Sequence, residues 1–299
     1  MKKANILATA ALATLLAACS NDSDVFNTPD YADTPIGLNV NVSPMATRAG
    51  YEQGALTEGS FGLYLTTEGT NSDERYNCTN REVKYDNGWT IQGGQLLWKS
   101  NDATVTYYAY LPYTGTVSDA VNYAFTVKTD QSTEDNVKAS DLLWTGQQTA
   151  IPGTALDITF KHALSKLNVT LTNGSELEDG VTFTSVRLSN CATATTVNLT
   201  AGTAGTATNS GQTITLYAAT ANEKYECILV PQTFAQSLKV EITDDNGKVY
   251  TFTSNKDLTF ASGKQYTLNL TVGRDKVTTG TISAESWGEE QQGGDLVTE

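Results

Sequence analysis

Apolar and polar residues alternate in many short segments of this chain, and this period of two constrains the fold more than any other feature. Successive side chains of a β-strand point to opposite faces, so the alternation predicts strands with one buried face. The clearest runs fall within 36–42, 61–65, 105–111, 167–171, 238–242 and 266–272. Asn-Gly pairs at 87–88 and 246–247 favour hairpin turns. The sequence therefore predicts an all-β fold built of β-sandwiches.

The length of 299 residues allows two sandwiches of ordinary size. We place their boundary at residue 158, which gives an N-terminal sandwich over 49–158 and a C-terminal one over 159–299. One stretch, 133–144, hints at a helix or an ordered loop. The stretch 200–211 is rich in Gly, Thr and Ala, and we predict a loop there.

The N-terminus has the pattern of an export signal. Lys2 and Lys3 precede an apolar stretch at 6–16, and Leu-Ala-Ala then leads directly to Cys19. A lipobox fits this pattern: residues 1–18 would be the signal peptide, and the acylated Cys19 would anchor the mature chain to the outer membrane. An ordinary signal peptide followed by a chance cysteine is the alternative.

The sequence offers little with which to build a catalytic centre. His162 is the single histidine, so we expect neither a Ser-His-Asp triad nor a histidine metal site, and we interpret His162 as a structural residue at a strand entry. The net charge of −14 disfavours binding to a phosphate backbone. We therefore predict no catalytic residue, no metal, no cofactor and no nucleic-acid partner. A surface hydrolase acting through paired carboxylates stays as an alternative class.

Three cysteines remain beyond the signal: Cys78, Cys191 and Cys227. Their spacing matches no zinc or redox motif, and an odd number allows at most one bridge. Cys191 and Cys227 are the candidate pair, while a buried free thiol at Cys227 is the favoured alternative.

Several further segments follow one another in a characteristic order. Asp-Leu-Leu-Trp stands at 141–144, Leu-Asp-Ile-Thr-Phe-Lys-His-Ala-Leu-Ser-Lys-Leu-Asn-Val at 156–169, and Tyr-Ala-Tyr-Leu-Pro-Tyr at 108–113. Other matching segments are 61–64, 229–233, 263–270 and 282–287. Together with the lipobox, this order resembles the fimbrillins, the Mfa-like and FimA-like pilin subunits of type V pili.

The resemblance implies two tandem transthyretin-like β-sandwiches and a specific route of assembly. In that family an Arg-specific, trypsin-like protease removes the N-terminal segment with its first strand, which opens a groove. A strand from a neighbouring subunit then fills that groove. Here the cut would fall between Arg48 and Ala49, so residues 19–48 would be a lipidated pro-segment. The removable strand would carry four inward side chains: Ile36, Leu38, Val40 and Val42. An ordinary solvated charge is the alternative interpretation of Arg48.

We therefore expect a structural subunit of a fimbria, at its tip or in its stalk, that supports surface adhesion and is not an enzyme. Its partners would be other pilin subunits by strand addition, outer-membrane lipid through Cys19 before processing, and receptors on host or bacterial surfaces. A glycan-binding surface lipoprotein of a nutrient-uptake system is the alternative. That alternative needs a sugar-stacking platform, whereas we expect the four tryptophans in the core: Trp89, Trp98, Trp144 and Trp287.

Overall fold

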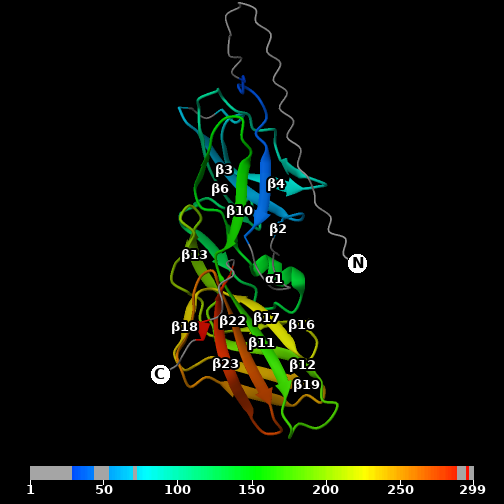
Figure 1. Cartoon of the computed structure of the whole chain (residues 1–299). Helices are drawn as coiled ribbons and strands as arrows, with labels where there is room; N and C mark the ends of the chain where they lie inside the picture. The colour runs from blue at the N-terminus through cyan, green and yellow to red at the C-terminus, as the bar shows by residue number, and fades with distance from the viewer. Residues whose placement is uncertain (1–28, 44–53, 70–72, 288–293, 296–299) are drawn as a thin grey trace, which may run out of the picture. The chain divides into compact units, whose positions relative to one another are not determined.

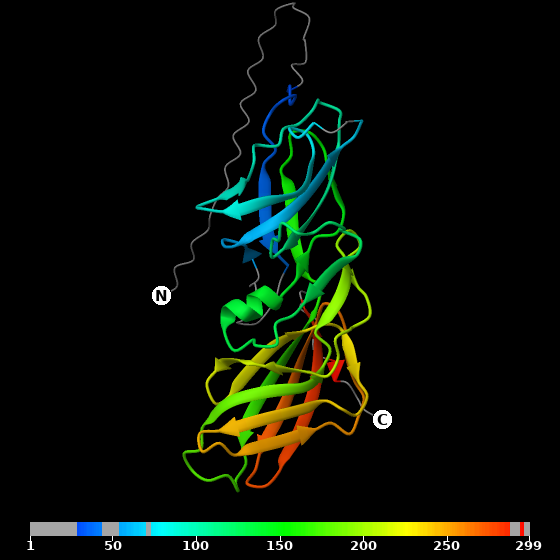
Figure 2. The same cartoon turned by 180° about the vertical axis from the view of Figure 1, so that it is seen from behind.

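A computed structural model describes residues 29–43, 54–69, 73–287 and 294–295 (Figures 1 and 2). Nearly all of their regular secondary structure is β-strand, which confirms the predicted all-β fold. Their single helix is α1 (Glu134–Ser140), inside the stretch predicted as a helix or ordered loop. The hydroxyl of Thr133 accepts a hydrogen bond from the Asn136 amide and caps this helix. In the described part of the chain, no helix has the length and apolarity needed to cross a membrane.

The N-terminal part of the chain builds a nine-stranded sheet. Its main path runs β2-β1-β10-β8-β6-β3-β4-β5, and β9 pairs with β6. The strands are β1 (Leu38–Val42), β2 (Gly54–Ala55), β3 (Ser60–Thr67), β4 (Cys78–Tyr85), β5 (Trp89–Ile91), β6 (Val105–Leu111), β8 (Leu143–Trp144), β9 (Gln148–Ala150) and β10 (Leu156–His162).

Two further sheets lie face to face as layers in the C-terminal part (Figures 1 and 2). One has the order β16-β17-β11-β22-β23-β24 and the other the order β15-β12-β19-β20. Their strands are β11 (Ser165–Asn173), β12 (Phe183–Cys191), β15 (Gln212–Thr215), β16 (Tyr217–Thr220), β17 (Lys224–Leu229), β19 (Lys239–Asp244), β20 (Val249–Thr253), β22 (Lys264–Val272), β23 (Val277–Ser286) and β24 (Gly294–Asp295). Apolar side chains from both sheets fill one core between them.

Five short strands complete the structure. They pair as β14-β13-β7 and as β18-β21, with bounds β7 (Tyr123–Thr126), β13 (Ala194–Asn198), β14 (Thr203–Ala204), β18 (Gln232–Phe234) and β21 (Leu258–Phe260). The stretch 200–211 is therefore not the plain loop that its composition predicts. Gly205 donates to the Thr196 carbonyl at 2.7 Å, and a Cβ at Gly205 would lie 2.8 Å from the Thr196 hydroxyl. The small residue lets this backbone approach and pair with β13.

Both Asn-Gly pairs form turns as predicted. Asn87 and Gly88 have positive φ angles of 51° and 153° and link β4 to β5. Gly247, at φ 80°, links β19 to β20, where an Asp244 carboxylate oxygen accepts from the amides of Asn246 (2.9 Å) and Lys248 (2.8 Å). The Asp244 carboxylate therefore stabilises the turn by accepting from its backbone amides.

The buried apolar residues fall into two clusters. One lies on the nine-stranded sheet and includes Phe61, Trp98 and Phe160. The other fills the C-terminal layers and includes Val127 and Val137, which precede residue 158 in the chain. The division into two domains at residue 158 stays a prediction.

Candidate functional site

Strand β1 lies close to the edge of the nine-stranded sheet. It pairs in parallel with β10 over its whole length, with Leu38 opposite Leu156 and Val42 opposite Phe160 (β1 blue and β10 green in Figure 1). On its other side, its one partner among the described strands is the two-residue strand β2. One full-length ladder therefore holds β1 in the sheet.

The apolar side chains of β1, and of Ile36 just before it, insert into the core as the alternation predicts, with one difference. Ile36 (2% exposed), Val40 (7%) and Val42 (2%) are buried, whereas Leu38 is partly exposed and packs at the margin of the same cluster. Burying a side chain of this size contributes about 1.5–3 kcal/mol before conformational entropy is subtracted. The strand is thus held by apolar contacts as well as by its ladder.

The β10 side of this contact is equally apolar. Leu156, Ile158 and Phe160 are fully buried, and the Phe160 ring packs edge-on against Phe61 at 5.4 Å between ring centroids. Tyr107 reaches the same strand, and its hydroxyl donates to the Asp157 carbonyl at 3.1 Å. Without β1, a row of β10 backbone groups and this apolar floor would face water.

Three of the predicted site residues lie outside the described ranges: Cys19, Arg48 and Ala49. The predicted cut falls in sequence between β1 and β2, within residues 44–53 that are not described.

The other polar residues singled out from the sequence have structural surroundings. His162 is the last residue of β10, and β11 begins three residues later, so it closes one strand and does not enter the next. Its Nδ1 lies 2.8 Å from an Asp141 oxygen, with both side chains buried. Its ring stacks on Trp287. Sequence reasoning missed this partnership, because no local pattern links residues so far apart in the chain.

The three described cysteines are buried and free, so Cys191 and Cys227 form no bridge in this structure. Burial raises the pKa of the Cys191 thiol to about 12 and that of Cys227 well above its usual range. Inert buried thiols are the alternative that the sequence favoured for Cys227. Within the described residues, no group of His, Cys, Asp and Glu is arranged to hold a metal ion.

The tryptophans pack against the protein. Trp98 and Trp287 are buried. Trp89 donates its indole N–H to the Leu56 carbonyl at 3.1 Å and packs on Phe61. Trp144 lies against Gly202, where a Cβ would stand 1.8 Å from the ring. Trp89 and Trp144 are partly exposed, and each packs against the protein.

A family model described as fimbrillin-like matches residues 47–287. The chain belongs to the fimbrillin-like family. It is 26% identical to a candidate fimbrium subunit, Fim1C, of Bacteroides uniformis, over 99% of this chain and 98% of the relative. The match to the family confirms the resemblance read from the sequence.

Solved structures share the fold of this fimbrillin-like chain. A candidate cell adhesion protein of Bacteroides uniformis has a TM-score of 0.61 at 24% identity, covering 84% of this chain and 98% of that one. A candidate cell adhesion protein of Bacteroides ovatus has a TM-score of 0.63 at 17% identity, covering 87% and 100%. A fimbrial protein of Bacteroides vulgatus has a TM-score of 0.50 at 15% identity, covering 83% and 99%.

Proposed function

We propose that this fimbrillin-like chain is a structural subunit of a fimbria, assembled by strand exchange after a protease cuts between Arg48 and Ala49. The observation that carries the proposal is the position of β1, a largely buried apolar strand whose one full-length partner among the described strands is β10. The predicted cut lies in the connection from β1 to the rest of the sheet. Cutting there would leave β1 bound by non-covalent contacts alone.

The effective concentration of β1 explains how the cut would act as a switch. While β1 is covalently attached, it competes for its groove at a high effective concentration and excludes other strands. After the cut it can dissociate, and it leaves an unpaired β10 and apolar pockets that water disfavours. A strand from a neighbouring subunit, with a similar alternation, would restore both the ladder and the burial.

We further propose that Cys19 is acylated and holds the precursor on the outer membrane before it is cut, and that the assembled fimbria supports adhesion at the cell surface. The subunit would act by assembly and not by catalysis. Its two sandwiches would span residues 49–158 and 159–299. Metabolic labelling with palmitate should mark the wild-type chain and leave a Cys19→Ser chain unmarked, and equal labelling of both would exclude the anchor.

The test of assembly compares wild type with Arg48→Ala, using Arg274→Ala as a matched control. Arg274 is an exposed arginine in the turn between β22 and β23. Sheared surface filaments should contain wild type and Arg274→Ala. The Arg48→Ala chain should stay with the cells as a folded, uncut precursor. Incorporation of Arg48→Ala at the wild-type level would overturn the proposal.

A further inference from the structure

The chain just upstream of β1 is held by a second set of contacts, separate from the β1 ladder. Three backbone hydrogen bonds of 2.7–2.9 Å join residues 33–36 to residues 96–98. They run from Asp33 N to Trp98 O, from Trp98 N to Thr34 O, and from Ile36 N to Leu96 O. Gln95 adds a side-chain bond from its Nε2 to the Ile36 carbonyl at 3.0 Å. This short antiparallel ladder binds the segment to residues 96–98, which lie outside the named strands, and not to β10.

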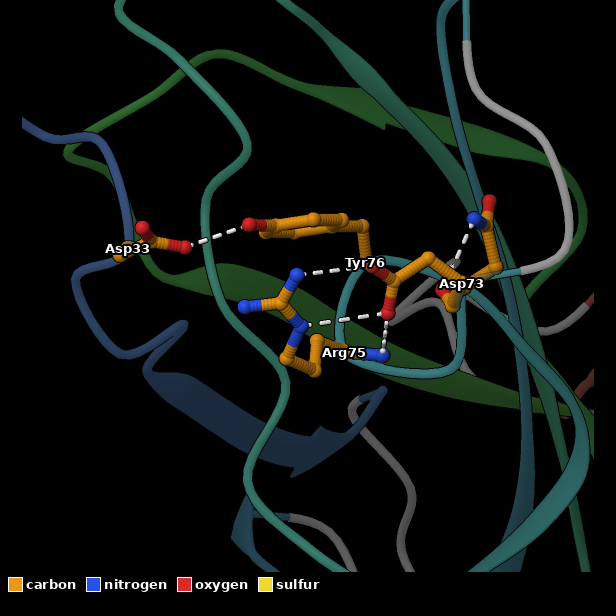
Figure 3. Close-up of polar contacts among 5 residues, drawn as sticks. Asp33, Asp73, Arg75 and Tyr76 are labelled. Carbon is orange, nitrogen blue, oxygen red and sulfur yellow. Dashed lines mark hydrogen bonds and ion pairs between the residues drawn. The ribbon is translucent and has the colours of Figure 1, made fainter.

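Side chains from the turn before β4 reinforce this ladder. The Tyr76 hydroxyl donates to the Asp33 carboxylate, as Figure 3 shows. The Arg75 guanidinium lies over the Tyr76 ring, 4.9 Å from its centroid, and donates to Asp73 at 2.9 Å from Nη2 and 3.3 Å from Nε. Asp73 thus fixes Arg75, and Arg75 covers the tyrosine that binds Asp33. We call these four side chains and the ladder between 33–36 and 96–98 the clasp.

Electrostatics favour this arrangement. The Arg75 hydrogen bonds lower the pKa of Asp73, and the bond to Asp33 raises the pKa of Tyr76. The Arg75 carbonyl also accepts from the Leu97 amide at 2.8 Å, so the turn and the 96–98 segment are bonded to each other. The N-terminal segment bonds to residues 96–98 through its backbone and to the turn through Asp33, and these two attachment points are bonded to each other.

Tyr31, at the N-terminal end of this segment, also contacts the rest of the protein. The Tyr31 amide donates to the Asn101 side chain at 2.6 Å. Its ring packs so closely on Gly153 that a Cβ there would lie 2.4 Å from the ring. Residues 31–36 consequently have hydrogen bonds and a ring contact of their own, in addition to the burial of Ile36 in the apolar cluster that β1 shares.

We propose that the clasp retains the N-terminal segment after cleavage and sets the rate at which the segment leaves. This inference rests on the proposed function, because it concerns the segment released by the cut after Arg48. The new chain end would lie beyond Ser43, on the C-terminal side of β1, and the clasp lies on its N-terminal side. A strand that displaces β1 from the cut end meets the clasp last.

The chemistry of the two holding regions separates their roles. The β1 contacts are buried and apolar, so weakening them also disturbs the core. The side-chain contacts of the clasp are polar and at the surface, so a single substitution weakens retention and leaves the core packed. Tyr76→Phe removes only the hydroxyl that binds Asp33, and Asp33→Ala removes its acceptor. Tyr85→Phe is the matched control, because the Tyr85 hydroxyl has no hydrogen bond in the described structure.

The experiment uses the purified full chain in two states. In the uncut chain, hydrogen exchange read by mass spectrometry should be about threefold or more faster at residues 31–36 in Tyr76→Phe and Asp33→Ala than in wild type. After cutting with an Arg-specific protease, the fraction of segment still bound is followed by gel filtration, counting only chains whose mass shows a single cut after Arg48. The half-time of release should shorten about threefold or more in both clasp variants. Tyr85→Phe should match wild type in both measurements.

The outcomes separate the two ideas. Equal release half-times for wild type, Tyr76→Phe and Asp33→Ala would overturn the clasp and leave the proposed function standing. If the segment stays bound to wild type and dissociates only from Tyr76→Phe and Asp33→Ala, the result supports the clasp. If the segment stays bound in every form, even with excess synthetic peptide of residues 34–43, the proposed function itself is overturned.

Discussion

The imidazole of His162 lies stacked on the indole of Trp287, with ring centroids 3.8 Å apart and ring planes 13° apart. His162 ends β10 of the nine-stranded sheet, and Trp287 directly follows β23 of the six-stranded sheet. The carboxylate of Asp141 accepts from His162 Nδ1 at 2.8 Å and sets the orientation of the ring. This stack joins the ends of strands from two sheets through one aromatic contact.

Removing the indole should be costly for this reason. Trp287 is 5% exposed, and Trp287→Ala should lower the free energy of unfolding by about 3–5 kcal/mol. Trp287→Phe keeps an aromatic face for His162 and should lose clearly less. Urea denaturation followed by circular dichroism measures both values. A Trp287→Ala protein as stable as Trp287→Phe would show that the stack contributes little.

A buried ion pair gives a second prediction. Lys166 Nζ on β11 lies 2.8 Å from Glu226 Oε2 on β17, with side chains 0% and 4% exposed. Lys166→Met should destabilise the protein by about 3–5 kcal/mol, because Glu226 would lose its buried cation. The double variant Lys166→Met/Glu226→Leu should recover most of that loss, since neither charge is then buried. A double-mutant cycle in urea tests this, and additive effects of the two single changes would contradict it.

The side-chain amide of Gln131 makes the two backbone hydrogen bonds that a neighbouring strand would otherwise make to Ile228. Its Nε2 donates to the Ile228 carbonyl at 2.9 Å, and its Oε1 accepts from the Ile228 amide at 2.8 Å, so it extends the β17 ladder by one amide. Gln131→Met has a similar shape but leaves both backbone groups buried and unbonded. We expect a loss of about 2–4 kcal/mol in the free energy of unfolding. Gln148→Met, at an exposed position of β9, should change stability by under about 0.5 kcal/mol.

The buried Tyr64 should make the stability of the folded chain fall at alkaline pH. Its hydroxyl finds no hydrogen-bond partner in the described part of the chain, and burial raises its pKa from 10.0 to about 12. The folded chain therefore keeps this proton at a higher pH than the unfolded chain, so its contribution to stability is lost as pH rises from 10 to 12. Tyr64→Phe should be at least as stable as wild type at pH 7, and its advantage should grow across that window.

Melting temperatures measured from pH 7 to pH 12 test this prediction. Tyr110→Phe is the matched control, because its hydroxyl bonds to Asn80 and to the Thr114 carbonyl, both at 2.7 Å. That substitution should destabilise the protein at pH 7. An equal loss in Tyr64→Phe at pH 7 would mean that the Tyr64 hydroxyl has a partner after all.

Local pattern was enough to locate strands. The run 105–111 became β6 with the bounds that alternation predicts, and the run 266–272 lies inside β22. The four apolar residues of the run 36–42 were also predicted to face inward, and three of them are buried. Alternation works at this level because it reflects which face of a strand is buried, and each strand carries that information in its own residues.

Partners and polar contacts were decided by the tertiary structure. Nothing in residues 38–42 indicates a parallel ladder with 156–160, and nothing in the segment Asp73–Glu74–Arg75–Tyr76 indicates that Tyr76 binds Asp33. The bonds from the Gln131 side-chain amide to Ile228 and the stack of His162 on Trp287 could not be predicted from the sequence either. An alternation of period two specifies which face of a strand is buried but not which strand lies beside it. A polar side chain has many equivalent partners in the sequence, and only the folded backbone brings one of them within hydrogen-bonding distance.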